Sequence, residues 1–397
     1  MIICIAGQSN IAIDVCEYIL RTYLDVELMA ITNKNDVGIN RIQKSFDKYV
    51  KCNDKIQQVQ LEDVYHIENL LFLSLEFDRI IQPSLFKTHN LYNIHFSKLP
   101  SYKGMYTAAL PILHGAKQTG VTLHCIDSGI DTGDIIAQEI YDLTSCDTAE
   151  SVYVNNIQLG TKLVIEYLSK LISGQVKPFP QSPHDSTYFS KKSIDYKNLK
   201  INFKCTAQQL NAQIRAFNFR QYQLPIVNSS PIAYSVITSK RSIHKPGTIL
   251  NETDVYIEIA TIDYDVLLYK DRLDEIILYC KNNDLHSILT IDNVLEFINL
   301  RTKENGWTPL MVAAYNNSYD TVEYLIENGA NVNAVNYNGT TPLMYAKDSA
   351  LQYGDIRILN LLLENKADRY IKDFDGKDIF FYLQNQSKEL YDYIKNY

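Results

Sequence analysis

Polar residues that could transfer an acyl group occur in two short segments of the chain. Asn93 and His95 lie at the end of one apolar run, and the turn from Asp127 to Asp134 follows a second apolar run that contains His124. Alternate side chains of a strand share one face, so Asn93 and His95 are expected to point the same way. The glycine-rich turn can bring Asp131 back toward that face.

An amide, an imidazole and a carboxylate at strand ends suit acyl transfer to an amine. The imidazole of His95 can take a proton from the attacking amine, and an amide N–H of Asn93 can stabilise the oxyanion of a tetrahedral intermediate. The carboxylate of Asp131 can orient the imidazole and raise its basicity. Spacing alone supports a structural role equally well, because single strand histidines and D-x-G-x-D-x-G turns are common in scaffolds.

The histidine and cysteine patterns predict no metal site. His95, His114 and His124 show no i, i+4 or H-x-E spacing, and His114 falls in an expected helix at 110–115, where a structural role is expected. The seven cysteines never occur in C-x-x-C spacing, which is typical of reduced thiols. With no signal-like start and no apolar stretch of about 20 residues, we predict a cytoplasmic protein without membrane contact.

The elements that must hold these residues are those of an α/β domain, expected over residues 1–180. Apolar runs of strand length at Ile2–Ala6 and Val26–Thr32 flank a helical pattern, which makes a βαβ unit and implies a parallel sheet. Only Gly7 of a G-x-G-x-x-G turn is present, so the fold is Rossmann-like without support for a dinucleotide site. Further strands are expected at residues 70–75, 91–94, 121–126 and 135–140.

The length of the chain and its pattern of apolar residues predict further segments after the first domain. A chain of 397 residues is expected to form two or three domains. A helix that begins with a capping box of Asp147 and Glu150 is expected to close the first domain. Residues 181–265 contain short alternating runs and one helical stretch at 207–217, which favours a small α+β segment.

Residues 266–397 contain an internal repeat. The segment from Gly306 to Met311 (GWTPLM) recurs 33 residues later from Gly339 to Met344 (GTTPLM). A G-x-T-P-L-x-x-A signature with this period resembles the ankyrin repeat and implies an α-helical repeat domain. A degenerate third copy begins at Asp375, and Leu273–Leu289 is expected to cap the other end.

The polar segments of the first domain resemble the signature of the folate-dependent formyltransferases. The pattern is Asn-x-His-x-Ser, Leu-Pro and Lys-Gly, followed by G-V-T-x-H-x-x-D-x-x-x-D-x-G-D; it spans residues 93–134, and the likeness extends over roughly residues 1–220. The resemblance implies a catalytic trio of Asn93, His95 and Asp131 and a 10-formyltetrahydrofolate donor. It also implies donor contacts from Phe77, Asp78, Arg79, Ile80 and Asp127.

The acceptor is expected to be a nucleotide sugar. A net charge of −8 disfavours RNA, and with it the methionyl-tRNA branch of the family. The segment with Asn218 and Tyr222 resembles the nucleotide-contacting part of the nucleotide-sugar N-formyltransferases, so Tyr222 can stack on a thymine ring. Lys103 can hold a diphosphate. The expected substrate-binding residues are Lys103, Gly104, Met105, Tyr106, Thr107, Asn218 and Tyr222. Packing is the competing role for Tyr222, because the chain contains 29 tyrosines.

The combination with ankyrin repeats resembles the dTDP-3-amino-3,6-dideoxyglucose N-formyltransferases of O-antigen synthesis. The 4-amino-4,6-dideoxyglucose isomer is the alternative acceptor, and an ankyrin protein-interaction module on an inactive formyltransferase scaffold is the alternative function. The resemblance also implies a homodimer through residues 181–265, which include nucleotide contacts.

The single tryptophan, Trp307, occupies a repeat position that normally faces solvent. With Tyr337 and Tyr345 one repeat away, it suggests a second, regulatory nucleotide-sugar site. A binding hot spot for a protein partner and packing on the neighbouring domain are the competing interpretations.

Overall fold

The computed structural model describes residues 1–34, 43–373 and 375–397. The chain divides into two compact units, Met1–Lys270 and Asp271–Tyr397, and residues 181–265 belong to the first of them. The expected fold class is confirmed: the first unit is a Rossmann-like α/β structure with a smaller α+β part, and the second is helical.

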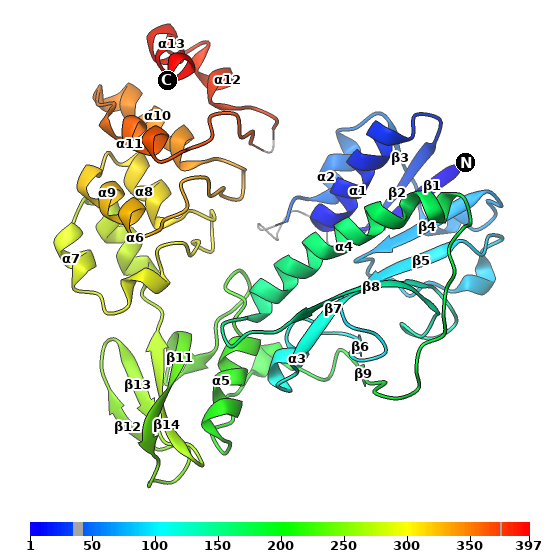
Figure 1. Cartoon of the computed structure of the whole chain (residues 1–397), viewed down its shortest axis with the longest axis horizontal. Helices are drawn as coiled ribbons and strands as arrows, with labels where there is room; N and C mark the ends of the chain where they lie inside the picture. Colours follow the sequence, from blue (N-terminus) through cyan, green and yellow to red (C-terminus); the bar gives the residue numbers. More distant parts are fainter. Residues whose placement is uncertain (35–42, 374) are drawn as a thin grey trace. The chain divides into compact units, whose positions relative to one another are not determined.

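Within the described residues, a seven-stranded sheet forms the centre of the first unit (Figure 1). Its order is β3 (Ile56–Gln58), β2 (Glu27–Thr32), β1 (Ile2–Gly7), β4 (Leu70–Leu75), β5 (Leu91–His95), β7 (Gln118–Cys125) and β8 (Ile135–Asp142). The strands from β3 to β5 are parallel, whereas β7 and β8 pair antiparallel. All six predicted strands are present.

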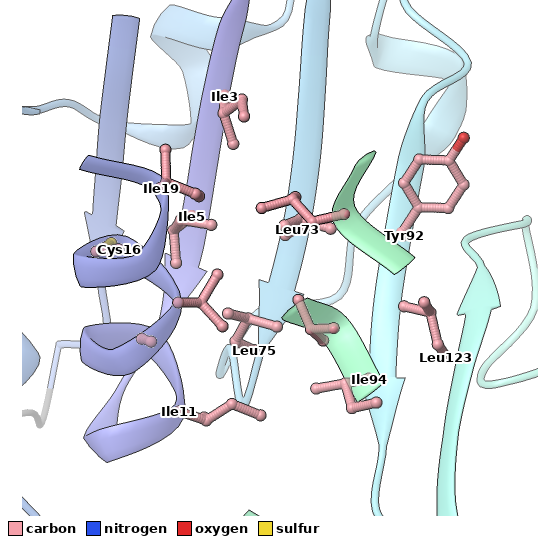
Figure 2. Packing of buried hydrophobic residues seen from close by; sticks show 14 of the residues in the cluster. Ile3, Ile5, Ile11, Cys16, Ile19, Leu73, Leu75, Tyr92, Ile94 and Leu123 are labelled. Carbon is pink, nitrogen blue, oxygen red and sulfur yellow. The ribbon is translucent and has the colours of Figure 1, made fainter. Parts of the chain in front are cut away.

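Two long helices pack on one face of this sheet. They are α1 (Ser9–Thr22) and α4 (Ala149–Ile172). Ile11 and Ile19 of α1, eight residues apart and therefore on one side of the helix, belong to the same buried cluster as Ile3 and Ile5 of β1, and Figure 2 shows Ile19 beside Ile5. Burying one such side chain stabilises the fold by about 1.5–3 kcal/mol, so this layer holds the first strand firmly against the helix.

The helix α4 approaches strand β5 closely. A Cβ atom at Gly160 would lie 3.1 Å from the ring of Phe96 and 3.3 Å from Ile94. The missing side chain therefore lets the helix lie directly on the strand that carries Asn93 and His95. The predicted cap of this helix was wrong by one residue: the Thr148 side chain accepts from the backbone N–H of Ser151, and Asp147 instead accepts from the Ser151 hydroxyl at 3.0 Å.

Shorter elements complete the region around the main sheet. They are α2 (Phe46–Lys51), α3 (Leu110–Leu113), the 3₁₀ turns η1 (Leu61–Val64), η2 (Pro83–Leu85) and η3 (Tyr196–Asn198), and a small parallel pair formed by β6 (Lys103–Gly104) and β9 (Tyr188–Phe189).

A second sheet makes up the remaining part of the first unit. Its order is β10 (Ile226–Val227), β11 (Ser230–Arg241), β14 (Tyr264–Lys270), β13 (Tyr256–Ile259) and β12 (Ile249–Glu252). The helix α5 (Ala207–Ala216) buries Leu210 and Ile214 against one face of this sheet. The opposite face presents Val236, which is 44% exposed, beside the stacked rings of Tyr234 and Tyr269.

The second unit consists of successive helix pairs. They are α6 (Leu273–Lys281) with α7 (Leu285–Leu289), α8 (Pro309–Tyr315) with α9 (Tyr319–Glu327), α10 (Pro342–Tyr353) with α11 (Arg357–Glu364), and α12 (Ile379–Leu383) with α13 (Lys388–Asn396); a 3₁₀ turn, η4 (Val294–Glu296), lies between the first two pairs.

The Thr-Pro motif of the repeats has a direct structural cause. The side chains of Thr308 and Thr341 accept hydrogen bonds from the N–H groups of Met311 and Met344, and the following proline occupies the first helical turn, where no N–H is needed. In the degenerate third copy, Asp378 caps α12 in the same way. None of the helices in the described part of the chain combines the length and the apolar character needed to cross a membrane.

Candidate active site

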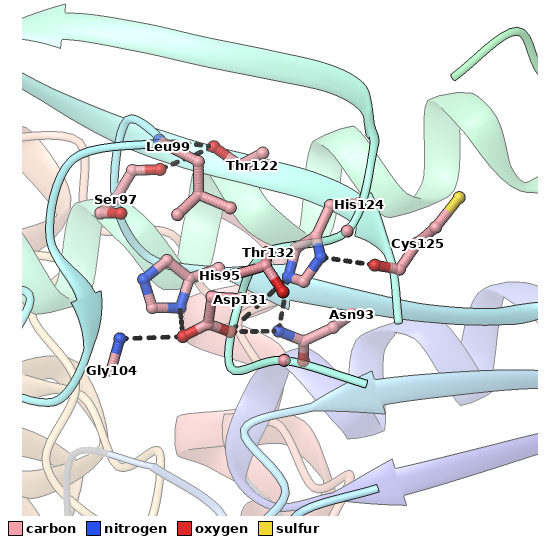
Figure 3. A network of polar contacts seen from close by, with 12 residues as sticks. Asn93, His95, Ser97, Leu99, Gly104, Thr122, His124, Cys125, Asp131 and Thr132 are labelled. Atoms are coloured by element: carbon pink, nitrogen blue, oxygen red, sulfur yellow. Dashed lines mark hydrogen bonds and ion pairs between the residues drawn. The ribbon is translucent and has the colours of Figure 1, made fainter. Parts of the chain in front are cut away.

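Strands β5 and β7 bring the candidate catalytic residues together at one end of the sheet (Figure 3). The two strands are antiparallel neighbours in which Asn93 pairs with His124 and His95 pairs with Thr122. Asp131 lies in the turn between β7 and β8. The structure therefore gathers Asn93, His95 and Asp131 around one point, with His124 as a fourth member.

Asp131 is the centre of this network. Its Oδ2 lies 3.4 Å from Nδ1 of His95 and accepts a hydrogen bond of 2.8 Å from the backbone N–H of Gly104. Its Oδ1 lies 3.4 Å from Nδ2 of Asn93. The residue has φ +55°, a left-handed conformation that an aspartate adopts more readily than most residues. The amide of Gln181 donates to its carbonyl at 2.8 Å, which fixes the turn from outside.

His124 was given only a supporting role from sequence, but it contacts the trio directly. Its Nδ1–H donates to the carbonyl of Cys125 at 2.8 Å, so the neutral ring presents Nε2 as an acceptor. Nδ2 of Asn93 donates to that nitrogen at 3.0 Å. His124 thereby orients the Asn93 amide so that its N–H groups, and not its oxygen, face the centre of the site.

The tautomer of His95 follows from a backbone carbonyl. Its Nε2 lies 2.8 Å from the carbonyl oxygen of Tyr102, which can only accept, so Nε2 carries the hydrogen. In the neutral ring the lone pair is then on Nδ1, which faces Asp131. This differs from the predicted arrangement, because the backbone orients the ring and the carboxylate faces the basic nitrogen itself.

The loop between β5 and Tyr102 is held by a buried threonine. Thr122 donates from its hydroxyl to the carbonyl of Ser97 at 2.7 Å and accepts from the N–H of Leu99 at 3.2 Å. The Leu99–Pro100 peptide bond in this loop is cis. These contacts place the Tyr102 carbonyl against His95.

Burial and charge act in opposite directions on the two titratable groups. Burial lowers the pKa of His95 below its ordinary value of 6.5, and this outweighs the raising effects of Asp131 and the Tyr102 carbonyl. Burial would raise the pKa of Asp131, but the attraction of His95 and the hydrogen bond from Gly104 help bring it to about 2. At neutral pH the site therefore holds a neutral imidazole beside an ionised carboxylate.

The residues expected to bind the substrate have mixed environments. Lys103 is buried and its ammonium donates to the Ser186 hydroxyl at 3.2 Å, while Gly104 donates to Asp131. The Asn218 amide donates to the carbonyl of Ala233 at 2.7 Å.

The other residues of that set are more accessible. Met105 and Tyr222 are exposed, and Thr107 is partly exposed. Tyr106 donates from its hydroxyl to the carbonyl of Lys191 at 3.0 Å. The ring of Tyr222 lies edge-on to Phe219 at 4.8 Å.

Four of the five residues expected to contact the donor follow strand β4, which is the neighbour of β5, the strand of Asn93 and His95. Phe77 packs on the core, whereas Ile80 is 73% exposed. Arg79 forms an ion pair of 2.6 Å with Glu62. The N–H of Asp78 donates to the Asn33 side chain at 3.2 Å.

Asp127 and His114 have local structural partners. The Asp127 carboxylate accepts from the Thr132 hydroxyl at 2.7 Å and from the N–H of Gly129, and so shapes the turn that ends at Asp131. His114 stacks on Tyr102 with ring centroids 5.8 Å apart. Among residues 1–34, 43–373 and 375–397, no three His, Cys, Asp or Glu side chains are grouped so that they could hold a metal ion.

Trp307 is half-buried in the second unit. Its ring lies 4.4 Å from that of Tyr345 and 5.6 Å from that of Tyr315. Tyr337, which was expected beside it, donates from its hydroxyl to the carbonyl of Thr302 at 3.1 Å. The tryptophan therefore belongs to an aromatic cluster that spans two successive repeats.

Comparisons with known proteins agree with both units. Residues 43–168 match the formyl transferase family, and residues 276–373 match ankyrin repeats in three copies. The crystal structure of WlaRD, a sugar 3N-formyl transferase in the presence of dTDP and 5-N-formyl-THF, is 41% identical over 68% of this chain and 97% of its own, with a TM-score of 0.63.

Two further relatives show the range of the likeness. The N-formyltransferase from Helicobacter canadensis, solved with folinic acid and dTDP-3-aminofucose, is 41% identical over 68% of this chain and 100% of its own, with a TM-score of 0.63. The methionyl-tRNA formyltransferase of Coxiella burnetii is 26% identical over 259 residues, which are 61% of this chain and 82% of that protein.

Proposed function

This chain belongs to the formyltransferase family, and on that premise we propose that it transfers a formyl group from 10-formyltetrahydrofolate to the amine of a dTDP-linked amino-dideoxy sugar. The observation that carries this proposal is the convergence of Asn93, His95 and Asp131 in one network. The general activity, formyl transfer, follows from the family; the acceptor is the part proposed here.

A sugar acceptor is favoured over tRNA by two observations. WlaRD and the N-formyltransferase from H. canadensis are each 41% identical over nearly their whole length, against 26% for the methionyl-tRNA enzyme of C. burnetii. The chain also has 46 acidic and 38 basic residues, a balance that opposes binding to a phosphate backbone.

We assign the proton transfer to one nitrogen atom of His95. As the amine forms its bond to the formyl carbon, Nδ1 of His95 accepts the amine proton, because Nε2 is held by the Tyr102 carbonyl. Asp131, ionised and 3.4 Å away, stabilises the imidazolium that results. The charge thus forms beside a carboxylate that is already in place. The bond between the formyl carbon and N10 of the donor then breaks, and the proton passes from His95 to N10, so that the products are the N-formyl sugar and tetrahydrofolate.

Asn93 is positioned to stabilise the negative charge that develops on the formyl oxygen. Its Nδ2 makes a shorter contact with His124, at 3.0 Å, and a longer one with Asp131, at 3.4 Å. The longer contact is the weaker and can be exchanged for the formyl oxygen, while His124 keeps the amide oriented.

The residues after β4 fit the donor. 10-Formyltetrahydrofolate supplies the electrophilic formyl carbon, and its flat pterin needs an accessible apolar contact. Ile80, 73% exposed next to the strand of the trio, offers one, and Asp127 shapes the turn on the other side. We place the pterin between these segments, with Phe77, Asp78 and Arg79 forming the strand end behind it.

The acceptor best supported is dTDP-3-amino-3,6-dideoxy-D-glucose, for O-antigen synthesis. WlaRD is described as a sugar 3N-formyl transferase, and the H. canadensis enzyme was solved with a dTDP-3-amino sugar. The exposed ring of Tyr222 can stack on thymine. The 4-amino isomer remains the alternative.

All seven cysteines are free thiols, which supports the expected cytoplasmic location.

The direct test is a coupled assay of the full chain with 10-formyltetrahydrofolate and a panel of dTDP-amino sugars. We expect turnover of the 3-amino-3,6-dideoxyglucose compound, with a lower kcat/KM for the 4-amino isomer. His95→Asn is expected to lower kcat by about 100-fold to 10,000-fold, the usual contribution of a general base. Absence of turnover with every sugar, or an unchanged rate in His95→Asn, would show that the proposal is wrong.

A further inference from the structure

A second polar cluster lies at the point where the main sheet changes direction. The order β2-β1-β4-β5 means that the chain leaves β1 toward one edge and β4 toward the other. In such sheets the carboxyl ends of the two central strands border a crevice in which ligands bind. Ser9 follows β1 and Glu76 follows β4 at this position.

Ser9 and Glu76 hold each other in place. The Ser9 hydroxyl donates to Oε2 of Glu76 at 2.5 Å, and the hydroxyl of Tyr153, from helix α4, donates to the same oxygen at 3.2 Å. Ser9 is buried and Glu76 is partly exposed. The carboxylate is therefore oriented by two donors from separate elements while part of its side chain reaches the surface.

Both residues adopt an uncommon backbone conformation. Ser9 has φ +64° and Glu76 has φ +60°, values that cost free energy for residues other than glycine. The side chain of Asn33 donates to the Glu76 carbonyl at 2.8 Å and so stabilises this turn of the chain. Backbone strain of this kind tends to cluster at active sites and ligand-binding positions.

The cluster is one strand away from the catalytic trio. Leu75 of β4 pairs with Ile94 of β5, so the next residues along the two parallel chains, Glu76 and His95, follow at the same level. Neighbouring strands are about 4.8 Å apart, which is close to the width of a pyranose ring. A sugar with its amine at His95 can therefore present the substituent of a neighbouring ring carbon to Glu76.

The same cluster is connected to the expected nucleotide contact. The ring of Tyr153 packs on Phe219 at 5.5 Å, and Phe219 packs on Tyr222 at 4.8 Å. Burial and the charge of Glu76 raise the pKa of Tyr153 well above its ordinary value and that of Tyr222 to about 12, so both hydroxyls stay protonated. Glu76 is thus linked through Tyr153 and Phe219 to the residue that is expected to contact the base.

The negative charge of the Glu76 carboxylate determines which part of the substrate it can bind. It repels a diphosphate, but it accepts hydrogen bonds from sugar hydroxyls, and it can accept up to about four such bonds. We propose that Glu76 is a specificity-determining residue that accepts a hydrogen bond from a hydroxyl next to the amine-bearing carbon, with Ser9 and Tyr153 as positioning residues. This inference rests on the proposed sugar N-formyltransferase function.

The test compares the full-length wild type with Glu76→Gln on three substrates: dTDP-3-amino-3,6-dideoxyglucose and its two analogues that lack the 2-hydroxyl or the 4-hydroxyl. We expect Glu76→Gln to lower kcat/KM for the parent sugar by about 10-fold to 100-fold, because a charged acceptor is replaced by a neutral one. For the analogue that lacks the recognised hydroxyl, wild type and variant should agree within about twofold, since no bond remains to be lost.

Three further variants separate recognition from packing. Tyr153→Phe removes a hydroxyl but keeps the ring, and Ser9→Gly removes a hydroxyl but keeps the left-handed backbone. Each variant should reduce the preference for the parent sugar over the analogue that lacks the recognised hydroxyl, by a smaller factor than Glu76→Gln does. Glu323→Gln is the matched control, because it neutralises the acceptor of a tyrosine–carboxylate hydrogen bond of the same 3.2 Å length in the second unit. It should leave the preference unchanged.

The outcomes distinguish the two proposals. Equal losses on all three sugars in Glu76→Gln would overturn the role of Glu76 and leave the proposed function standing. No turnover of any of these sugars by the wild type would overturn both. Should Glu76→Gln fail to fold, an unchanged preference in both Tyr153→Phe and Ser9→Gly would count against the proposal.

Discussion

At the scale of single residues, the site depends on which nitrogen of His95 is basic. The Tyr102 carbonyl holds the hydrogen on Nε2, and Nδ1 therefore faces Asp131. This detail could not be predicted from sequence, because it depends on the path of a loop that Thr122 secures from another strand. That Asn93, His95 and Asp131 lie together could be expected, because alternation along β5 and a glycine-containing turn are local properties, whereas their catalytic role is implied by the family resemblance.

The pH dependence of kcat should follow from these environments. Burial lowers the pKa of His95 below 6.5, so the acidic limb of kcat should lie below pH 6.5. The folded state binds this proton less readily than the unfolded state, so the free energy of unfolding should fall as the pH drops below 6.5. Asp131, with a pKa near 2, adds stability that is complete above pH 3.8 and lost as the pH falls toward 2.

The measurement is kcat at saturating substrates from pH 5 to 8, together with urea unfolding over the same range. Asp131→Asn removes an interaction that raises the pKa of His95, so the midpoint of the His95 imidazole, followed by NMR, should move to lower pH in that variant. A midpoint above 6.5 in the wild type would contradict this account.

At the scale of elements, the sequence predicted which segments form strands but not how they pair. His124 could be placed on a strand, yet its contact with Asn93 arises because β7 runs antiparallel to β5, a pairing set by tertiary structure. The contact between Ser9 and Glu76 joins residues 67 positions apart, and no local pattern marks it. The cap of α4 was misplaced because Asp147 and Thr148 are adjacent and both are good capping residues.

The second sheet is the expected interface of a homodimer. Its face away from α5 presents Val236 and Leu267, which pair across β11 and β14, beside the stacked Tyr234 and Tyr269. We expect the chain to be a dimer in solution and Val236→Lys to shift it toward the monomer, because a charge would be buried in the interface.

Light scattering over a range of concentrations gives the mass of both proteins. Ile243→Lys, at an exposed loop position of the same region, is the control and should remain dimeric. A wild type that is monomeric at every concentration, or a Val236→Lys variant that stays dimeric, would exclude this surface.

At the scale of the whole molecule, the solved relatives at 41% identity match 68% of this chain and nearly all of their own length. The ankyrin unit is thus an addition to an otherwise complete formyltransferase. Its repeat could be predicted almost fully, because G-x-T-P-L is a local capping signal that recurs. Its ligand could not, because the aromatic cluster of Trp307, Tyr315 and Tyr345 is compatible with nucleobase stacking and with protein binding.

The single tryptophan makes the second-site hypothesis directly measurable. A thymine stacked on Trp307 should quench its fluorescence in a saturable way when dTDP is added, and no other tryptophan contributes to the signal. Tyr345→Ala should weaken the apparent affinity, whereas Tyr353→Ala, at an exposed site outside the cluster, should not. Emission that does not respond to dTDP would exclude the hypothesis and leave protein binding and packing as the roles open to the cluster.

The left-handed backbone at Glu76 also limits how the acceptor preference of this enzyme can be re-engineered. Glycine, asparagine and aspartate adopt that conformation most readily, so a small library at position 76 is best built from them. Aspartate keeps the negative charge on a side chain that is one methylene shorter. Asparagine is equally short but neutral, and glycine has no side chain at all. Each replacement would also relax the chain, which would offset part of the stability lost when the hydrogen bonds from Ser9 and Tyr153 are weakened or removed.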